Sequence, residues 1–479
     1  MFTTFTPDLT KAWRWPLLPR ILTGLLVCST AWLAAEANAL HDLPLGEFPT
    51  SYKVNLERVQ YNGWTAFLMT NGIVTLIIAP DIGGRAIQLR LGDQDYFFVN
   101  KTLAGKVLSH SENDVNSGWA NYGGDKVWPA PQGWMDDEHW PGPPYYELDG
   151  SKFQAEVLRD GGSEAAVRVT SPPDPGTGIQ FVRTFHVFAG TTRVEIDQVM
   201  RNISHRRVRW GIWDNIQNDA SDSANPTKPN PEIYMYVPIN PKSRYPNGCY
   251  VLFGDVRHPS YQIVQGGQML GIHYLYRVGK VAVDSSAGWY ALVNGQKDLG
   301  LIETFRYSPT SDYPDGASVE SWNNGPGVIS LGPYDMTLPD DIRKTPYIME
   351  SEVLSPYATL DPGQEYSFPV YLLPTRISNP VQDVVQAGAV CQPLSAKVES
   401  GQVSLHGVYG VFEPGILEAA FHSASGEELT HVQLMLVDPR TVVKLDKSVV
   451  LPPQAFRVSL RVLDSNGENL GYLGNTVLK

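Results

Sequence analysis

Short runs in which apolar and polar residues alternate dominate the chain after its first forty positions. Residues 65–70 and 73–79 flank Asn71-Gly72, a dipeptide typical of two-residue β-hairpins. Residues 181–188 and 193–200 form two longer runs of the same kind. Helical periodicity never extends beyond a few turns in this part of the sequence. The pattern therefore predicts an all-β protein built from antiparallel strands.

The strand-like runs fall into two blocks. Residues 40–380 would supply roughly fifteen or more strands of ordinary length, too many for one common sandwich, so we expect a very large double-sheet sandwich. Residues 396–479 contain no Trp and predict a small β-sandwich of immunoglobulin-like size. Its expected strands are 402–406, 417–422, 432–437 and 456–462. Residues 381–395 are predicted to be a linker.

The first 39 residues have the features of an export signal. Three basic residues precede an apolar stretch at 21–35 that is too short to span a bilayer comfortably, and Ala37-Asn38-Ala39 follows as a cleavage site. The basic residues are Lys11, Arg14 and Arg20. We expect a mature chain that begins at Leu40 and is exported, either periplasmic or secreted, with no later membrane span. The alternative is an uncleaved N-terminal anchor.

Composition narrows the classes of ligand. The chain has 479 residues and a net charge of -13, which argues against a nucleic-acid partner. Twelve Trp residues are many for a plain scaffold. In the mature chain Cys249 and Cys391 are the two cysteines, either paired or separate buried thiols. No metal-binding, phosphate-binding or nucleophile motif is present, so we expect no metal and no cofactor.

Residues 121–134, NYGGDKVWPAPQGW, combine aromatic rings with charged groups. Their Gly and Pro content excludes a helix, and Pro129 with Pro131 argues against a central strand, so we predict a rigid loop. Trp128 and Trp134 would offer flat apolar faces, and the polar side chains would offer hydrogen bonds, as a sugar requires. The alternative is that both Trp residues plug one end of the sandwich.

Two further clusters carry charged groups on apolar strands. In residues 210–215, WGIWDN, alternation places Trp213 and Asp214 on opposite faces, and Asp214 must find a cleft or a place at the strand end. Glu350 and Glu352 share one face of a third strand. They are either solvated or poised for proton transfer.

Four motifs together resemble the galactose-mutarotase-like (aldose 1-epimerase-like) superfamily, and within it the domain-of-unknown-function type 4380. The resemblance covers about residues 45–378. Its motifs are APDIGGR at 79–85, NYGGDKVWPAPQ at 121–132, MESE at 349–352 and LDPG at 360–363. It implies a β-supersandwich with a sugar site on one open face.

The resemblance also implies a chemistry. In mutarotases a glutamate takes the proton of the anomeric hydroxyl and a histidine protonates the ring oxygen. Glu350 or Glu352 matches the base position. No histidine stands in residues 210–215, where the acid is expected, and Lys126 or Asp214 is the candidate replacement.

The sequence thus predicts a saccharide site. Its expected catalytic residues are Glu350, Glu352 and Lys126, and its expected substrate-binding residues are Arg85, Asn121, Asp125, Trp128, Gln132, Trp213 and Asp214. For Arg85, which follows the Gly83-Gly84 turn, a salt bridge at the sheet edge is the equal alternative. An aldose epimerase or related isomerase, a non-catalytic glycan-binding protein and a structural envelope protein are the three functions in view.

Overall fold

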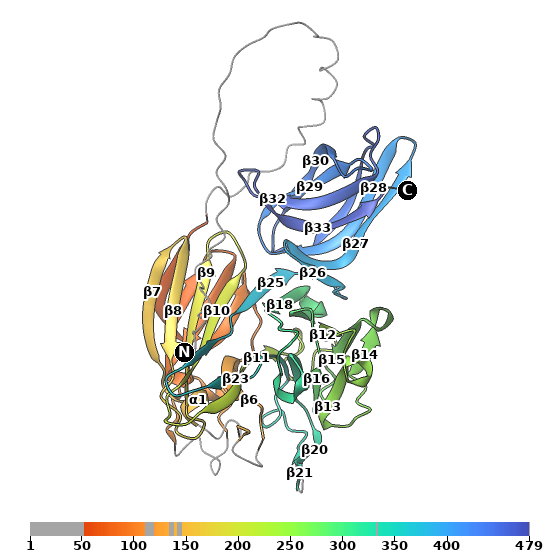
Figure 1. Cartoon of the computed structure of the whole chain (residues 1–479). Helices are drawn as coiled ribbons and strands as arrows, with labels where there is room; N and C mark the ends of the chain where they lie inside the picture. Colours follow the sequence, from red (N-terminus) through yellow and green to blue (C-terminus); the bar gives the residue numbers. More distant parts are fainter. Residues whose placement is uncertain (1–51, 111–118, 134–137, 141–145, 332–333, 479) are drawn as a thin grey trace, which may run out of the picture. The chain divides into compact units, whose positions relative to one another are not determined.

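The computed structural model describes residues 52–110, 119–133, 138–140, 146–331 and 334–478. The predicted signal peptide and Trp134 lie outside these ranges. Within them, strands form nearly all of the regular structure, and the α-helix is the single turn α1 (Tyr146–Asp149) (Figure 1). No helix of the described part is long and apolar enough to cross a membrane.

Twenty-three strands are linked by hydrogen bonds into one large antiparallel sheet. The strands of its first half are β1 (Val54–Tyr61), β2 (Trp64–Thr70), β3 (Val74–Ala79), β4 (Arg85–Leu91), β5 (Gln94–Asp95), β6 (Gly124–Ala130), β7 (Gln154–Gly162), β8 (Glu164–Thr170), β9 (Ile179–Phe188), β10 (Val194–Asn202), β11 (Val208–Asp219) and β12 (Ile233–Pro238). The others are β13 (Cys249–Gly254), β14 (Tyr261–Val264), β15 (Met269–His273), β16 (Gly279–Val283), β17 (Trp289–Asn294), β18 (Leu299–Phe305), β19 (Val319–Asn323), β22 (Ile348–Leu354), β23 (Ala358–Leu360), β24 (Glu365–Ser367) and β25 (Val370–Arg376). Short 3-10 turns between them span Pro80–Ile82, Lys101–Leu103, Pro246–Gly248, Gln265–Gly267, Gly295–Lys297 and Pro314–Gly316.

The large sheet folds back on itself into two layers. One path of pairings joins β9, β10, β25, β18 and β17, and the other joins β6, β11, β22, β19, β16 and β13. One apolar core contains residues of both paths, for example Phe185 and Ile196 from the first and Ile212 and Ile216 from the second. The predicted all-β fold with a very large sandwich is confirmed.

The C-terminal residues form two smaller sheets with a core of their own. One sheet contains β26 (Asp383–Val385), β27 (Gly388–Glu399), β28 (Gln402–Val411) and β31 (Val443–Val450). The other contains β29 (Gly415–His422), β30 (Glu428–Val437), β32 (Arg457–Leu463) and β33 (Asn469–Val477). Residues 381–395, predicted to be a linker, contain β26 and the start of β27. A separate hairpin pairs β20 (Gly327–Leu331) with β21 (Tyr334–Leu338), and Cys249 and Cys391 are free thiols.

The predicted loop at 121–134 is also wrong in its central part, because residues 124–130 are the buried strand β6. Pro129 lies opposite Ile212 of β11. The amide and carbonyl of Ile212 bond instead with Ser355 on the other side of β11. Position 129 therefore meets β11 at a pair without backbone hydrogen bonds, where the missing N–H of proline costs nothing.

The Asn71-Gly72 turn joins β2 and β3 as predicted, but the connection between the paired residues is longer than the two residues expected. Thr70 pairs with Thr75. The side chain of Asn71 accounts for the difference: its oxygen accepts from the amides of Ile73 and Val74, and its nitrogen donates to two carbonyls outside the hairpin. These bonds hold a wider connection than a type I′ turn.

Candidate functional site

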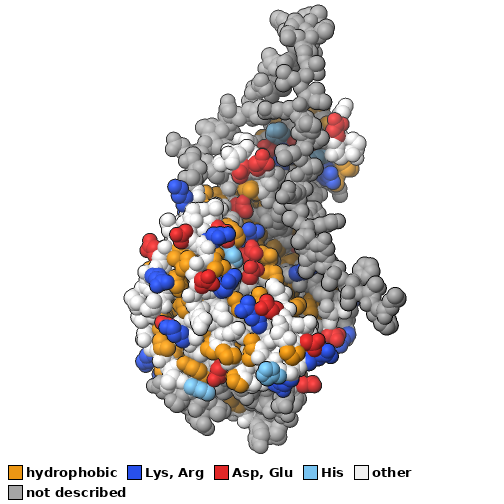
Figure 2. All heavy atoms as spheres, turned by 60° about the vertical axis from the view of Figure 1, so that its left-hand side comes forward, with side chains coloured by type: hydrophobic (Ala, Val, Ile, Leu, Met, Phe, Trp, Pro, Cys, Tyr) orange, Lys and Arg blue, Asp and Glu red, His pale blue; other side chains and the backbone are white. Residues whose placement is uncertain are grey.

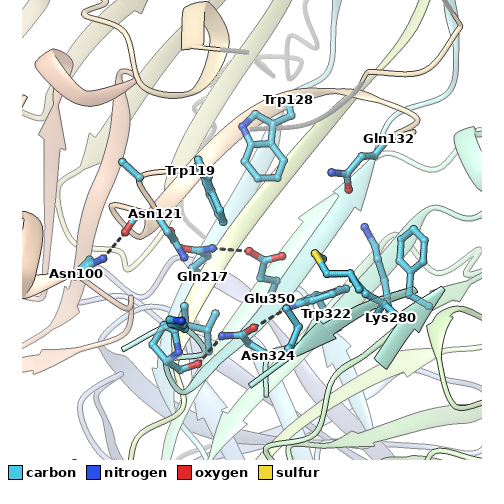
Figure 3. A pocket seen from close by; sticks show the side chains of 18 of the residues that line it. Asn100, Trp119, Asn121, Trp128, Gln132, Gln217, Lys280, Trp322, Asn324 and Glu350 are labelled. Carbon is cyan, nitrogen blue, oxygen red and sulfur yellow. Dashed lines mark hydrogen bonds between the residues drawn. The ribbon is translucent and has the colours of Figure 1, made fainter. Parts of the chain in front are cut away.

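A cavity of about 550 Å³ lies on the face of the sheet made by β6, β11, β22, β19 and β16 (Figure 3). Aromatic rings, amides and charged side chains line it together. Its lining includes Trp119, Asn121, Trp128, Gln132, Trp213, Gln217, Lys280, Trp322, Asn324 and Glu350. The strand register brings them side by side: Gln217 and Trp322 both stand opposite Glu350, and Lys280 stands opposite Trp322.

Glu350 is the carboxylate that faces the cavity, with 12% of its side chain exposed. Gln217 donates a 2.6 Å hydrogen bond to Oε1, and the Lys126 ammonium lies 3.5 Å from the same oxygen. Asn215 donates a longer bond, 3.4 Å, to Oε2. Oε1 is therefore held by two donors, while Oε2 keeps capacity to accept a proton or a hydrogen bond from a ligand.

Lys126 lies behind Glu350 and is buried. Its ammonium donates to the side-chain oxygen of Asn215 at 2.7 Å and sits 4.5 Å from the centre of the Trp128 ring. Burial lowers the pKa of Lys126, and the nearby Glu350 carboxylate opposes that change only in part. Lys126 thus fixes and polarises Glu350 from the protein side.

A second cluster of buried charged side chains, centred on Lys280, adjoins the cavity. Its ammonium lies 2.7 Å from Glu320 and 2.9 Å from Glu352, and 4.1 Å from the centre of the Trp213 ring. Burial raises the pKa of Glu320 to about 7 and that of Glu352 to about 8, although Lys280 opposes both shifts. Near neutral pH one of the two carboxyls therefore keeps a proton, and Lys280 stays charged against the other.

Trp119 and Trp128 form one wall of the cavity, the Trp wall, and one carboxylate positions both rings. Asp149 accepts the indole N–H of Trp119 at 2.7 Å and that of Trp128 at 3.0 Å. Arg85 pairs with the same carboxylate at 3.1 Å. At Gly83, where φ is 85°, a Cβ would lie 1.9 Å from the Asp149 carbonyl oxygen, so this approach requires glycine.

A sequence profile of the family described as "Domain of unknown function (DUF4380)" matches residues 66–368. This chain belongs to the DUF4380 family. The predicted type is therefore confirmed, and the matched residues include every strand of the cavity floor. None of the curated proteins compared with the chain matches it.

Solved structures similar to this DUF4380 protein share little sequence with it. A TPR-domain containing protein from Parabacteroides distasonis is 14% identical (TM-score 0.41) over 67% of this chain, which spans 48% of that protein. A galactose mutarotase-like protein from Clostridium acetobutylicum is 10% identical (TM-score 0.40), over 68% of this chain and 98% of its own. A galactose mutarotase related enzyme from Lactobacillus acidophilus is 10% identical (TM-score 0.41), over 66% and 100%.

Five of the predicted site residues line the DUF4380 cavity, and two more lie directly behind its wall. The lining residues are Asn121, Trp128, Gln132, Trp213 and Glu350. Lys126 and Glu352 form the layer beneath them, in contact with Glu350 and Lys280 respectively. Trp134, named with them as an aromatic face, lies outside the described residues.

Arg85 was predicted to bind the substrate, and the structure corrects this. Its side chain is fully buried and donates to the carbonyls of Ile82, Gly123 and Asp149 as well as to the Asp149 carboxylate. Arg85 therefore holds Asp149, the residue that positions the Trp wall, and does not face the cavity.

Asp125 and Asp214 are corrected in the same way, because both point into the core between the two layers. Arg183 of β9 binds Asp125 at 2.7 Å and Asp214 at 2.9 Å, and all three side chains are buried. Asp214 neither caps its strand nor reaches the cavity. The alternation predicted for β11 is correct: Trp213 faces the cavity, and Asp214 faces the core.

Several cavity residues were missed. Gln217 lies two positions after Asn215 on the face already assigned to Trp213, so alternation carried a signal for it. Trp322 and Lys280 come from β19 and β16, whose order beside β22 is set by long-range pairing. No local pattern marked them. Among the described residues, no group of three or more His, Cys, Asp or Glu side chains is placed to hold a metal ion.

The buried carboxyls of the core predict a pH dependence of stability. Burial, together with the neighbouring Asp125 carboxylate, raises the pKa of Asp214 to about 8, and burial raises the pKa of Glu303 of β18 as well. A carboxyl whose pKa is raised on folding binds its proton more tightly in the folded state. Stability is then complete below the unfolded pKa near 4 and is lost as pH rises toward the folded pKa.

We therefore expect the free energy of unfolding to fall between about pH 5 and pH 8, by about 1.4 kcal/mol per pH unit for each proton retained. Asp214→Asn should make this slope shallower by one proton, because the amide resembles the protonated acid. Urea unfolding at several pH values measures both slopes. If the free energy of unfolding falls with pH at the same slope in both proteins, the raised pKa of Asp214 is contradicted.

Proposed function

We propose that the DUF4380 cavity binds a saccharide and that Glu350 is its proton acceptor. The observation that carries the proposal is a carboxylate set among indole rings and side-chain amides in one cavity. Aromatic faces match the C–H surfaces of a pyranose, and amide and carboxylate groups match its hydroxyls. We also propose, on the N-terminal signal pattern, that the protein is exported.

The register sets Glu350 and Lys280 on either side of Trp322. Two strand spacings separate their backbones, roughly 10 Å. A pyranose resting on the Trp322 ring would lie between the carboxylate and the ammonium (Figure 3). This arrangement offers a base at one edge of the sugar and a cation at the other.

The reaction supported by that arrangement is interconversion of anomers. Glu350 takes the proton of the anomeric hydroxyl, the bond between C1 and the ring oxygen breaks, and the ring oxygen receives a proton from the Lys280 ammonium. Rotation about the C1–C2 bond followed by the reverse transfers closes the ring on either face, so no atom or electron is gained or lost. Lys126 positions Glu350 and does not touch the sugar.

A non-catalytic glycan-binding function is the second candidate. One observation favours it: none of the described residues that line the cavity is a histidine, the acid found in mutarotases. Lys280 is held by two carboxyls, which raise its pKa against the effect of burial, so it is a weaker acid than a histidine would be.

Proton NMR of freshly dissolved α-glucose and α-galactose separates the two candidates. The proposal predicts that the protein speeds the approach to anomeric equilibrium. Broadened sugar signals without acceleration would select the binding function, and neither effect would reject both for these sugars.

Trp322→Ala should weaken sugar binding by about tenfold, because a half-buried stacking ring is lost while the strand keeps its pairing. Titration of the sugar into the wild-type and variant proteins, followed by calorimetry, measures the change. Trp289→Phe, in the apolar core formed with β12 and away from the cavity, is the control and should leave binding unchanged. Equal affinities for Trp322→Ala and wild type would place the sugar elsewhere.

A further inference from the structure

A second cavity, of about 440 Å³, opens on the other side of the segment that follows β6. Pro131 lines this second cavity, and Gln132, the next residue, lines the first. The remaining walls come from Glu138, His139, Arg206, Arg207, Val208, Arg209, Trp210, Tyr357 and Thr359. Three arginines therefore gather at one cavity of a chain whose net charge is -13.

Each of the three guanidinium groups makes contacts within the protein and still has N–H donors that these contacts do not occupy. Arg206 donates from one Nη to the Gly176 carbonyl, and Arg207 donates from Nε to Asp361. Arg209 lies 4.0 Å from Asp312 and stacks 3.5 Å from the centre of the Tyr357 ring. Each guanidinium has five N–H donors, so these contacts of the described residues leave most of them for a ligand. Stacking on Tyr357 also fixes the plane in which the Arg209 guanidinium can donate two parallel hydrogen bonds to a carboxylate.

The second cavity and the first are aligned on one strand. Arg209 and Trp213 lie on the same face of β11, because strand side chains alternate, and four residues separate them by roughly 13 Å. Pro314 and the segment at 131–132 lie between the two cavities, so a ligand that reaches both must be a short oligosaccharide that passes over them rather than one sugar. Glu138 is the acidic residue that lines this wall, while Asp361 and Asp312, the carboxylates beside Arg207 and Arg209, lie outside the lining and are exposed.

We propose that the ligand of this DUF4380 protein is an acidic oligosaccharide, with one sugar in the first cavity and a uronic-acid carboxylate bound by Arg206 and Arg209 in the second. The proposal rests on the saccharide function proposed above and narrows its ligand class. Free anions would meet the same guanidinium groups, so the test compares sugars of equal length with and without the charge.

The experiment uses calorimetry at low salt with a trimer of galacturonic acid and with its methyl ester. Wild-type protein should bind the acid at least about tenfold more tightly than the ester, the effect of about one charge-assisted hydrogen bond. Arg206→Gln/Arg209→Gln should remove that difference and leave binding of the ester unchanged. Arg159→Gln is the matched control: Arg159 is also exposed and also lies 4.0 Å from a carboxylate, that of Glu164, but lines neither cavity.

Equal binding of acid and ester by the wild type, or an unchanged preference in the double variant, would overturn the proposal. Trp322→Ala distinguishes that result from a failure of the first cavity. If Trp322→Ala weakens both trimers while the arginines have no effect, the saccharide site stands and the acidic ligand is rejected. If only the arginine variant weakens the acid, the anion site stands and the first cavity loses its assignment. Absence of binding of either trimer would reject both.

Discussion

Glu350→Gln should lower the protein's acceleration of anomer interconversion by about 10²- to 10⁴-fold, the usual contribution of a general base. Glutamine keeps the shape of the side chain and can still accept from Gln217, but it cannot take the anomeric proton. Binding of the sugar should change little, since the hydroxyl contacts remain. Exchange NMR on the equilibrated sugar measures the rate, and calorimetry on the same sample measures the affinity.

Glu352→Gln is the control for this experiment, two residues further along the same face of β22. Glu352 is fully buried behind Lys280, and burial raises its pKa to about 8. Because glutamine resembles the protonated acid, this variant should keep most of the activity. A larger loss with Glu352→Gln than with Glu350→Gln would exchange the two roles, and full activity of Glu350→Gln would reject a carboxylate base.

Alternation along single strands predicted the faces of the site correctly. It placed Glu350 with Glu352, and it separated Trp213 from Asp214. It could not say which of the two glutamates meets the cavity, because that depends on the neighbours across the sheet. Gln217 and Lys126 approach Glu350, whereas Lys280 reaches Glu352, and these contacts arise from pairing between distant strands.

The wrong predictions share a physical cause. Asp214 was assigned to the ligand because a charge on an apolar strand needs a partner or a cleft, and Arg85 and Asp125 because they stand in the motifs at 79–85 and 121–132. The partners exist, but they come from distant residues, Asp149 and Arg183, and so the charges are satisfied inside the protein. Pro129 misled in a similar way, since a strand accepts proline at a pair without backbone hydrogen bonds.

Arg85 contributes both to the stability of the fold and to the geometry of the site, so we expect its replacement to lower the free energy of unfolding strongly. The guanidinium makes four hydrogen bonds in a fully buried position, and two of them hold Asp149. Arg85→Met would leave the Asp149 carboxylate buried, with the two indole N–H groups of Trp119 and Trp128 as its remaining side-chain donors among the described residues. Breaking a buried pair by removing one partner costs about 3–5 kcal/mol, so we expect a loss of that size in the free energy of unfolding.

Urea unfolding at pH 7 measures this loss, with Arg90→Met as the matched control. Arg90 lies on the same strand, β4, and pairs with Asp95 at the surface, where such a pair contributes about 1 kcal/mol or less. Arg85→Met/Asp149→Asn tests the cause, since removing the unpaired charge should return part of the stability lost in the single variant. A double variant that is as unstable as the sum of the two single changes would mean that Arg85 acts through packing and its backbone carbonyls. If the coupling is found, the Gly83-Gly84-Arg85 turn supports the proposed sugar site from behind, because Arg85 holds the carboxylate that orients two of the cavity's indole rings.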